Sequence, residues 1–190
     1  MILPVTAYGH PVLKKVGEEI DKDYPNLDKL ISDMWDTMYK TEGVGLAAPQ
    51  INLSIRLFVI DATPYEEEIP EVENKKKIFI NAKIVEEEGD EWFFQEGCLS
   101  VPKINEDVSR KSRVHIQYYD ENWEFHDEWY DGIFARIIQH EYDHTQGIVF
   151  VDRLSAMKRT LLKRKLTDII KGKVDVDYKM IFLKNKKGKK

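Results

Sequence analysis

The sequence predicts an α+β fold, and three features of the residue pattern lead to that prediction. Strand-like segments outnumber helix-like segments along the 190 residues. Short polar connections of the hairpin type recur between them, for example at residues 120–122. The strands are not regularly separated by helices, which argues against a doubly wound parallel sheet. We therefore expect mostly antiparallel sheets packed around a central helix, followed by a C-terminal helix and strand.

Three segments carry apolar residues at helical spacing, and each follows a side chain that can cap a helix. A glycine lies just past the end of each segment, where a left-handed residue commonly ends a helix. The predicted helices and their capping residues are 27–40 with Asn26, 132–145 with Asp131, and 156–171 with Ser155.

Short runs of β-branched and aromatic residues predict the strands. Their ranges are 55–61, 78–85, 91–95, 113–119, 123–130 and 174–182. Residues 63–77 are first acidic and then basic and contain two prolines, which is typical of a surface loop.

The composition is that of an ordinary globular protein, with 42% hydrophobic and 33% charged residues. We expect one domain over residues 1–183 and a basic, disordered tail over residues 184–190. A single cysteine excludes an intramolecular disulfide, and no apolar run is long enough to cross a membrane. The N-terminal residues lack the pattern of a secretory signal, so the expected location is cytoplasmic.

Charge is distributed unevenly along the chain. The formal net charge is -5, yet residues 154–190 contain 13 lysines and arginines against 3 aspartates, so the remainder is strongly acidic. A basic C-terminal segment can meet nucleic acid or another anionic surface. The competing interpretation is a solvated helix and tail that keep the protein soluble.

Residues 139–144 are the most informative segment, because they contain His-Glu-x-x-His within a predicted helix. Residues four apart share one helix face, so His140 and His144 can bind one metal ion, and Glu141 can reach a metal-bound water. Two adjacent apolar stripes on this helix predict that it is buried, and buried histidines need partners. This pattern disfavours the alternative of two unrelated histidines on a charged surface helix.

Two histidines do not complete a catalytic metal site, which commonly has three protein ligands. Cys98 is the better candidate for the third ligand, because it follows Gly97 at the end of a strand, where the backbone can approach another group closely. His10, His115 and His126 are expected to be structural or exposed. A lone cysteine is often only an inert buried residue, so both interpretations of Cys98 stay open at this point.

Three segments together resemble the peptide deformylase family. They are residues 43–50, 96–100 and 139–144, in the order and spacing of the family, and the resemblance covers about residues 1–155. It implies a metal-dependent hydrolase that removes the formyl group from the N-terminal formyl-methionine of newly synthesised polypeptides and releases formate. It also implies one divalent metal ion, with Fe²⁺ as the native metal and Zn²⁺ or Ni²⁺ in preparations.

The same resemblance implies a role for each matching residue. Cys98, His140 and His144 become metal ligands, Glu141 the catalytic acid and base, Gln50 and the backbone N–H of Leu99 the oxyanion donors, and Gly45 part of the substrate cleft.

The chemistry of these side chains agrees with the implied reaction. A metal lowers the pKa of its bound water towards neutrality, and the resulting hydroxide can attack the formyl carbon. Glu141 can accept the proton and deliver it to the leaving nitrogen. An oxyanion donor is worth about 3–4 kcal/mol, and the competing interpretation of Gln50 is a turn residue after Pro49.

Apolar side chains near these segments can form a pocket for the methionine side chain, with plain core packing as their alternative role. The candidates are Val44, Leu46, Ile133 and Ile137. Asp143 is expected to form a supporting ion pair with Arg110 or Arg113.

Two other classes of function compete with deformylation. A zinc endopeptidase of the His-Glu-x-x-His type recruits a downstream histidine or glutamate, but no histidine follows His144 and no glutamate follows Glu141. A non-catalytic metal-binding or ribosome-associated module would need neither Glu141 nor Gln50. The expected partners are N-formylmethionyl nascent chains and, through the basic C-terminal segment, the ribosome, with no membrane partner.

Overall fold

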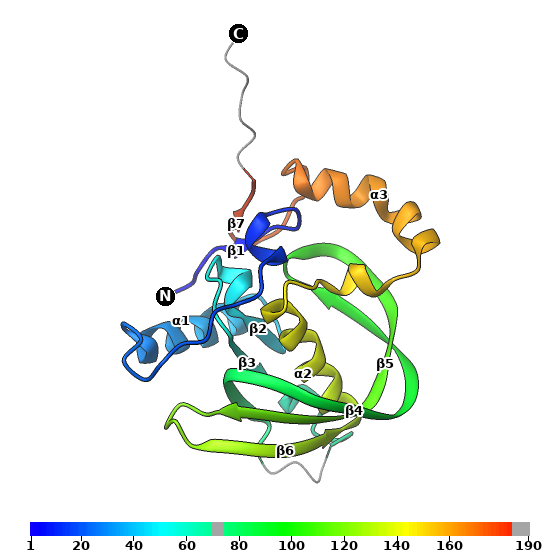
Figure 1. Cartoon of the computed structure of the whole chain (residues 1–190). Coiled ribbons are helices and arrows are strands. Elements are labelled where there is room, and N and C mark those ends of the chain that lie inside the picture. The colour runs from blue at the N-terminus through cyan, green and yellow to red at the C-terminus, as the bar shows by residue number, and fades with distance from the viewer. Residues whose placement is uncertain (70–73, 184–190) are drawn as a thin grey trace.

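The computed structural model describes residues 1–69 and 74–183 (Figure 1). Within them, a five-stranded antiparallel sheet is combined with helices and with one short parallel strand pair. The helices are α1 (Leu27–Lys40), α2 (Gly132–Thr145) and α3 (Ala156–Ile170). The sheet order is β2 (Gly45–Ala47), β3 (Leu57–Asp61), β4 (Lys76–Cys98), β5 (Val101–Tyr119) and β6 (Phe125–Asp131). The parallel pair is β1 (Val5–Thr6) with β7 (Met180–Ile181). The predicted α+β class is confirmed.

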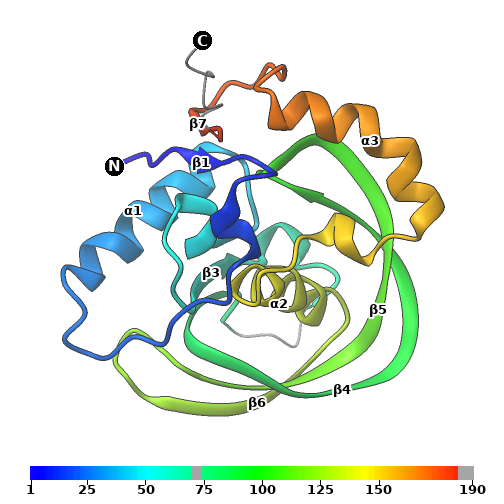
Figure 2. The ribbon, with the colours of Figure 1, turned by 45° about the horizontal axis from the view of Figure 1, so that its top comes forward.

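Helix α2 occupies the centre of the fold, as predicted, and strands β4, β5 and β6 curve around it (Figure 2). It contacts all five strands of the sheet, and most of its side chains are buried. The buried side chains include polar ones, among them Arg136, Gln139 and Asp143. Because buried polar groups need hydrogen-bond partners, this helix brings a polar network into the interior.

The three predicted capping residues behave differently. Ser155 caps α3 as predicted, because its side chain accepts a hydrogen bond from the Lys158 N–H at 3.2 Å. Asn26 and Asp131 occupy the capping positions of α1 and α2, but neither side chain makes a capping hydrogen bond. The predicted capping is therefore wrong for both. Asn26 instead adopts a left-handed backbone with φ 56°, which asparagine tolerates better than most residues.

The long β4–β5 hairpin also differs from the prediction. The sequence predicts separate strands at 78–85 and 91–95, but both segments lie within β4. β5 begins at Val101, well before the predicted start at residue 113. Register shifts within the hairpin bend it without ending it. The acidic run between the two predicted strands therefore lies at these bends.

The predicted surface loop, 63–77, is shorter in the structure. Thr63–Tyr65 forms a 3₁₀ turn, and Lys76 already belongs to β4. Residues 70–73 of this loop lie outside the described part of the chain.

The C-terminal strand is much shorter than the predicted range of 174–182, because only Met180–Ile181 is paired. Val174, Met180 and Phe182 pack against the core beneath α3, so their alternation reflects burial along an extended segment. The predicted tail, 184–190, lies outside the described residues. Among the residues that are described, no helix is long and apolar enough to span a membrane.

Candidate metal and catalytic site

A cavity of about 740 Å³ lies beside helix α2, between β2 and the turn that joins β4 to β5. An extended segment after α3 completes its border. The lining includes residues 43–45, Gln50, 96–99, Ile133, Ile137, His140, Glu141 and 175–178.

Three potential metal ligands converge beside this cavity, and two of them, Cys98 and His140, line it. Cys98 ends β4, and His140 and His144 lie one helical turn apart on α2. The Cys98 Sγ atom is 3.3 Å from His144 Nε2, and one ligand atom of each residue lies within 4.8 Å of the others. One thiolate and two imidazoles at these separations suit a single divalent ion such as zinc or iron. The structure thus brings together the three residues that the family resemblance implies.

Glu96 orients the His140 ring. Its Oε2 atom accepts a hydrogen bond from His140 Nδ1 at 2.8 Å, which leaves Nε2 available as a ligand atom. Arg110 donates two further hydrogen bonds to Glu96, at 2.7 and 2.9 Å, and Arg136 donates one at 2.9 Å. Burial alone raises the pKa of Glu96, but the hydrogen bonds from Arg110 and His140 outweigh burial and hold this pKa well below its usual value. These contacts therefore favour the carboxylate form of Glu96.

Asp143, between the two histidines, forms an ion pair with Arg110, the first of its two predicted partners. Arg110 donates to Asp143 Oδ2 at 2.7 Å, and Arg153 donates to both carboxylate oxygens at 2.5 Å. Arg113, the other predicted partner, pairs instead with Glu88 at 2.7 Å. Arg110 consequently links the carboxylate that supports His140 to the helix turn that carries both histidines.

Glu141 is buried beside the ligand cluster and is only 4% exposed. Its Oε2 atom has no hydrogen-bond partner among the described residues. Burial is the main cause that raises the pKa of Glu141 to about 7, while the charge of His140 acts in the opposite direction. A carboxyl group with this pKa can both accept and deliver a proton near neutral pH.

Gly45 allows β2 to approach α2 closely. A Cβ atom at this position would lie 2.4 Å from Glu141 Oε1 and 2.6 Å from the Glu141 Cδ and Cγ atoms. These distances are far shorter than van der Waals contact, so only glycine fits without displacing Glu141.

The Gln50 side chain directs its amide nitrogen at the ligand cluster. Its Oε1 atom accepts a hydrogen bond from the Ala47 N–H at 2.8 Å, and its Nε2 atom lies 3.4 Å from Cys98 Sγ. The bond from the Ala47 N–H agrees with the interpretation of Gln50 as a turn residue. The position of Nε2 beside Cys98 agrees with its interpretation as an oxyanion donor, so the two roles are compatible. Leu99 follows Cys98 in the two-residue turn between β4 and β5 and lines the cavity.

The apolar residues proposed for a substrate pocket divide into two groups. Val44, Ile133 and Ile137 line the cavity. The prediction for Leu46 is wrong, because this side chain is fully buried in a core cluster with residues of α1 and does not reach the cavity. Neighbouring residues of a strand face opposite sides, so Gly45 faces α2 and Leu46 faces away from it.

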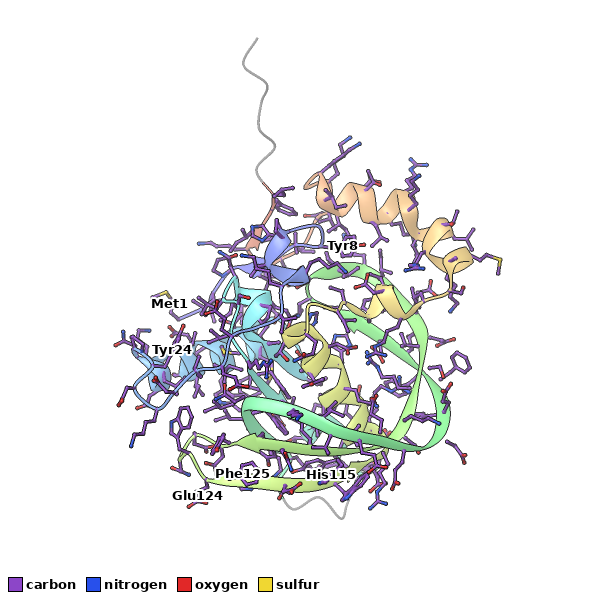
Figure 3. All side chains as sticks on the ribbon, viewed as in Figure 1. Met1, Tyr8, Tyr24, His115, Glu124 and Phe125 are labelled. Carbon is purple, nitrogen blue, oxygen red and sulfur yellow. The ribbon has the colours of Figure 1, made fainter. Side chains whose placement is uncertain are left out.

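The remaining histidines lie outside the cavity and have other contacts. His10 accepts a backbone hydrogen bond at the start of a 3₁₀ turn. His115 and His126 each pair with an aspartate. Figure 3 shows His115 beside β6, at the opposite end of the molecule from β1 and α3. These contacts favour the predicted structural or exposed roles, and His126 also lies in a second group of possible ligand atoms with Asp120 and Glu124.

In this site a cysteine and the two histidines of a His-Glu-x-x-His helix are placed to hold one metal ion, next to a buried glutamate. This arrangement is typical of the class of metal-dependent hydrolases. Comparisons with known proteins narrow this class. A sequence model described as "Polypeptide deformylase" matches residues 2–160. The peptide deformylase of Christiangramia forsetii is 56% identical over 100% of both chains, and that of Flavobacterium johnsoniae is 52% identical over 100% of both.

Solved structures show the same relationship. A peptide deformylase from Plasmodium falciparum has a TM-score of 0.79 and 38% identity, covering 88% of this chain and 95% of that chain. One from Legionella pneumophila has a TM-score of 0.78 and 36% identity, covering 91% and 98%. The chain belongs to the polypeptide deformylase family. It is accordingly a metal-dependent enzyme that removes the N-terminal formyl group from nascent polypeptides.

Proposed function

We propose that Cys98, His140 and His144 hold one divalent metal ion, beside which the amide of an N-formylmethionyl peptide is hydrolysed. The observation that carries the proposal is the convergence of these three donors next to Glu141, whose Oε2 atom has no partner among the described residues. The donor set fits a metal, since one imidazole is already locked by Glu96. When bound, the ion supplies Lewis acidity, which lowers the pKa of water and polarises the formyl oxygen.

Glu141 is the proposed acid and base. Its carboxylate accepts the proton of the attacking water and then delivers that proton to the methionine nitrogen as the formyl group leaves. Burial supports this role, because it places the pKa of Glu141 at about 7, where both protonation states are accessible. The close fit against Gly45 fixes the carboxyl group in position.

Gln50 and Leu99 are the proposed oxyanion donors. The Gln50 Nε2 group and the Leu99 backbone N–H border the cavity on the side of Cys98, where the formyl oxygen becomes negatively charged during attack. Preorganised donors of this kind stabilise the transition state more than the ground state. The bond from the Ala47 N–H supports preorganisation, because it fixes the Gln50 amide before substrate arrives.

Val44, Ile133 and Ile137 are the proposed pocket for the methionine side chain. All three line the cavity, and the two isoleucines lie one turn apart on α2, before the metal-binding histidines. A thioether side chain is flexible and apolar, so it suits a pocket bordered by branched aliphatic groups.

We propose ferrous iron as the native metal, which the family resemblance supports. A site with one thiolate and two imidazoles also accepts zinc or nickel. Because ferrous iron and the Cys98 thiolate are both oxidisable, the iron form should lose activity on exposure to oxygen or peroxide. Metal analysis after anaerobic purification tests this assignment, and an iron-free preparation with full activity would contradict it.

Formate release from formyl-Met-Ala by the iron-loaded protein tests the proposed function. An endopeptidase would release alanine instead, and a binding module would release neither product. Glu141→Ala should lower turnover by at least about 10²-fold while metal content stays near one ion per chain. Loss of the metal together with activity would show that Glu141 has been assigned the wrong role.

We further propose that residues 1–183 form a single catalytic domain that works in the cytoplasm at the ribosome, where new chains appear. The basic composition of α3 and the exposure of most of its charged residues support contact with an RNA-rich surface. Deleting residues 184–190 should weaken co-sedimentation with ribosomes at low salt and leave hydrolysis of short peptides unchanged. Equal co-sedimentation of the truncated protein would refute a role of this segment.

A further inference from the structure

Both carbonyl groups of the Leu99–Ser100 turn accept a hydrogen bond from a terminal segment of the chain. The Tyr178 hydroxyl donates to the Leu99 C=O at 2.8 Å. The Tyr8 backbone N–H donates to the Ser100 C=O, also at 2.8 Å. The turn that carries the proposed oxyanion donor is therefore held by residues from two distant parts of the sequence.

These two tyrosines are themselves fixed by the pairing of β1 with β7. The Val5 N–H donates to the Lys179 C=O at 2.8 Å, and the Ala7 N–H donates to the Ile181 C=O at 2.9 Å. Tyr8 directly follows this ladder and Tyr178 directly precedes it. Figure 1 shows β1 and β7 side by side, and Figure 3 shows Tyr8 next to them.

We propose that Tyr178 is a positioning residue for deformylation, since its hydroxyl holds the Leu99–Ser100 turn so that the Leu99 N–H faces the reacting carbonyl oxygen. This inference rests on the proposed function, because it assumes that the Leu99 N–H acts as an oxyanion donor. Tyr178 also lines the cavity and is half-buried, so its side chain reaches the turn from the cavity border.

The turn has few other anchors among the described residues. Cys98 and Val101 close it by pairing, and the buried Ser100 hydroxyl has no hydrogen-bond partner. The two carbonyl contacts fix the Leu99–Ser100 and Ser100–Val101 peptide groups, and through them the adjoining peptide group that carries the Leu99 N–H. A tyrosine hydroxyl is protonated at neutral pH and remains a donor throughout the working range.

A misaligned oxyanion donor weakens the stabilisation of the transition state more than it weakens the binding of the substrate. The donor must lie about 2.7–3.1 Å from the developing oxyanion, so a small rotation of the turn weakens the contact when the oxygen becomes charged. Loss of the Tyr178 hydroxyl should consequently lower kcat and leave KM nearly unchanged.

Tyr178→Phe in the full-length, metal-loaded enzyme tests this proposal. We expect kcat to fall by about tenfold, which corresponds to about 1.4 kcal/mol, with KM and metal content within twofold of the wild type. Tyr39→Phe is the matched control, because it removes a hydroxyl that donates at 2.8 Å to Asp61 outside the cavity. Its kcat should stay within twofold.

Hydrogen–deuterium exchange of the segment 98–101 provides a readout that does not depend on turnover. Exchange there should be faster in Tyr178→Phe than in the wild type and unchanged in Tyr39→Phe. Unaltered exchange or a kcat within twofold of the wild type overturns the proposal, and a rise in KM alone would instead make Tyr178 a substrate contact. If the wild type released no formate, the proposed function would fail, and the exchange comparison would still decide whether Tyr178 holds the turn.

Discussion

Replacing Gly45 with alanine should disable the active site while the rest of the fold persists. The added Cβ would lie 2.4 Å from Glu141 Oε1, whereas ordinary contact begins at 3.4 Å. One of the two groups must move by the difference, which is 1.0 Å. A displacement of about 1 Å in a catalytic group costs about 10²-fold in rate, or about 2.7 kcal/mol of transition-state stabilisation. Overpacking should cost a further 1–3 kcal/mol, roughly, in folding stability.

Steady-state formate release and urea unfolding of Gly45→Ala measure these two effects separately. Gly43→Ala is the matched control, since its Cβ would meet its nearest neighbour at 3.3 Å. We expect this control to retain kcat within about threefold, because the surrounding atoms need to give by only a few tenths of an ångström. A Gly45→Ala enzyme with nearly normal kcat would refute the reasoning that this glycine keeps Glu141 in place.

Three other perturbations address the metal, the buried network and the pH dependence of stability. Cys98→Ser should sharply weaken metal retention, because a neutral hydroxyl replaces a thiolate; full retention during dialysis would exclude Cys98 as a ligand. Arg110→Met should destabilise the fold by about 3–5 kcal/mol in urea unfolding, because it leaves two buried carboxylates without a shared partner; a loss under 1 kcal/mol would contradict this account. Burial raises the pKa of Asp61, but hydrogen bonds from Thr63 and the charge of Lys76 outweigh it and lower this pKa overall. The ionised form therefore stabilises the fold above the unfolded-state pKa, and this contribution is lost as the pH falls through the folded-state pKa. Asp61→Asn should make stability less sensitive to acidification below about pH 5, and identical pH profiles for the two proteins would show that Asp61 does not contribute.

Helix α2 and its two metal-binding histidines could be predicted from the sequence, because the residue pattern that predicts them is local. His140 and His144 are four residues apart, and helical geometry alone places them on one face. Cys98 is far from both in sequence, so its position after Gly97 at a strand end makes it only a candidate ligand, and the family resemblance is what implies the role. The supporting network could not be predicted in full, because Glu96 and Arg136 are 40 residues apart and come from different elements. Ion pairs across such separations depend on the tertiary fold.

The errors in secondary structure also have physical causes. The bends in the β4–β5 hairpin carry charged residues, and the sequence pattern there is the same as that of a surface loop. Leu46 is an apolar residue of the segment 43–50, and that alone predicts a place in the pocket. Recognising the short strand β2 would have corrected this assignment, since alternation places Leu46 on the face opposite Gly45.

The position of β2 leads to an expectation about sequence variety among the substrates. β2 is one of the two edge strands of the sheet, and Gly45 at its start and Val44 just before it border the cavity. An edge strand offers main-chain N–H and C=O groups to an extended peptide, and such pairing does not depend on the peptide's side chains. Selectivity can then rest on the formyl group and the first side chain alone. A cleft built in this way suits a catalyst whose substrates share one modified end and differ in every residue after it.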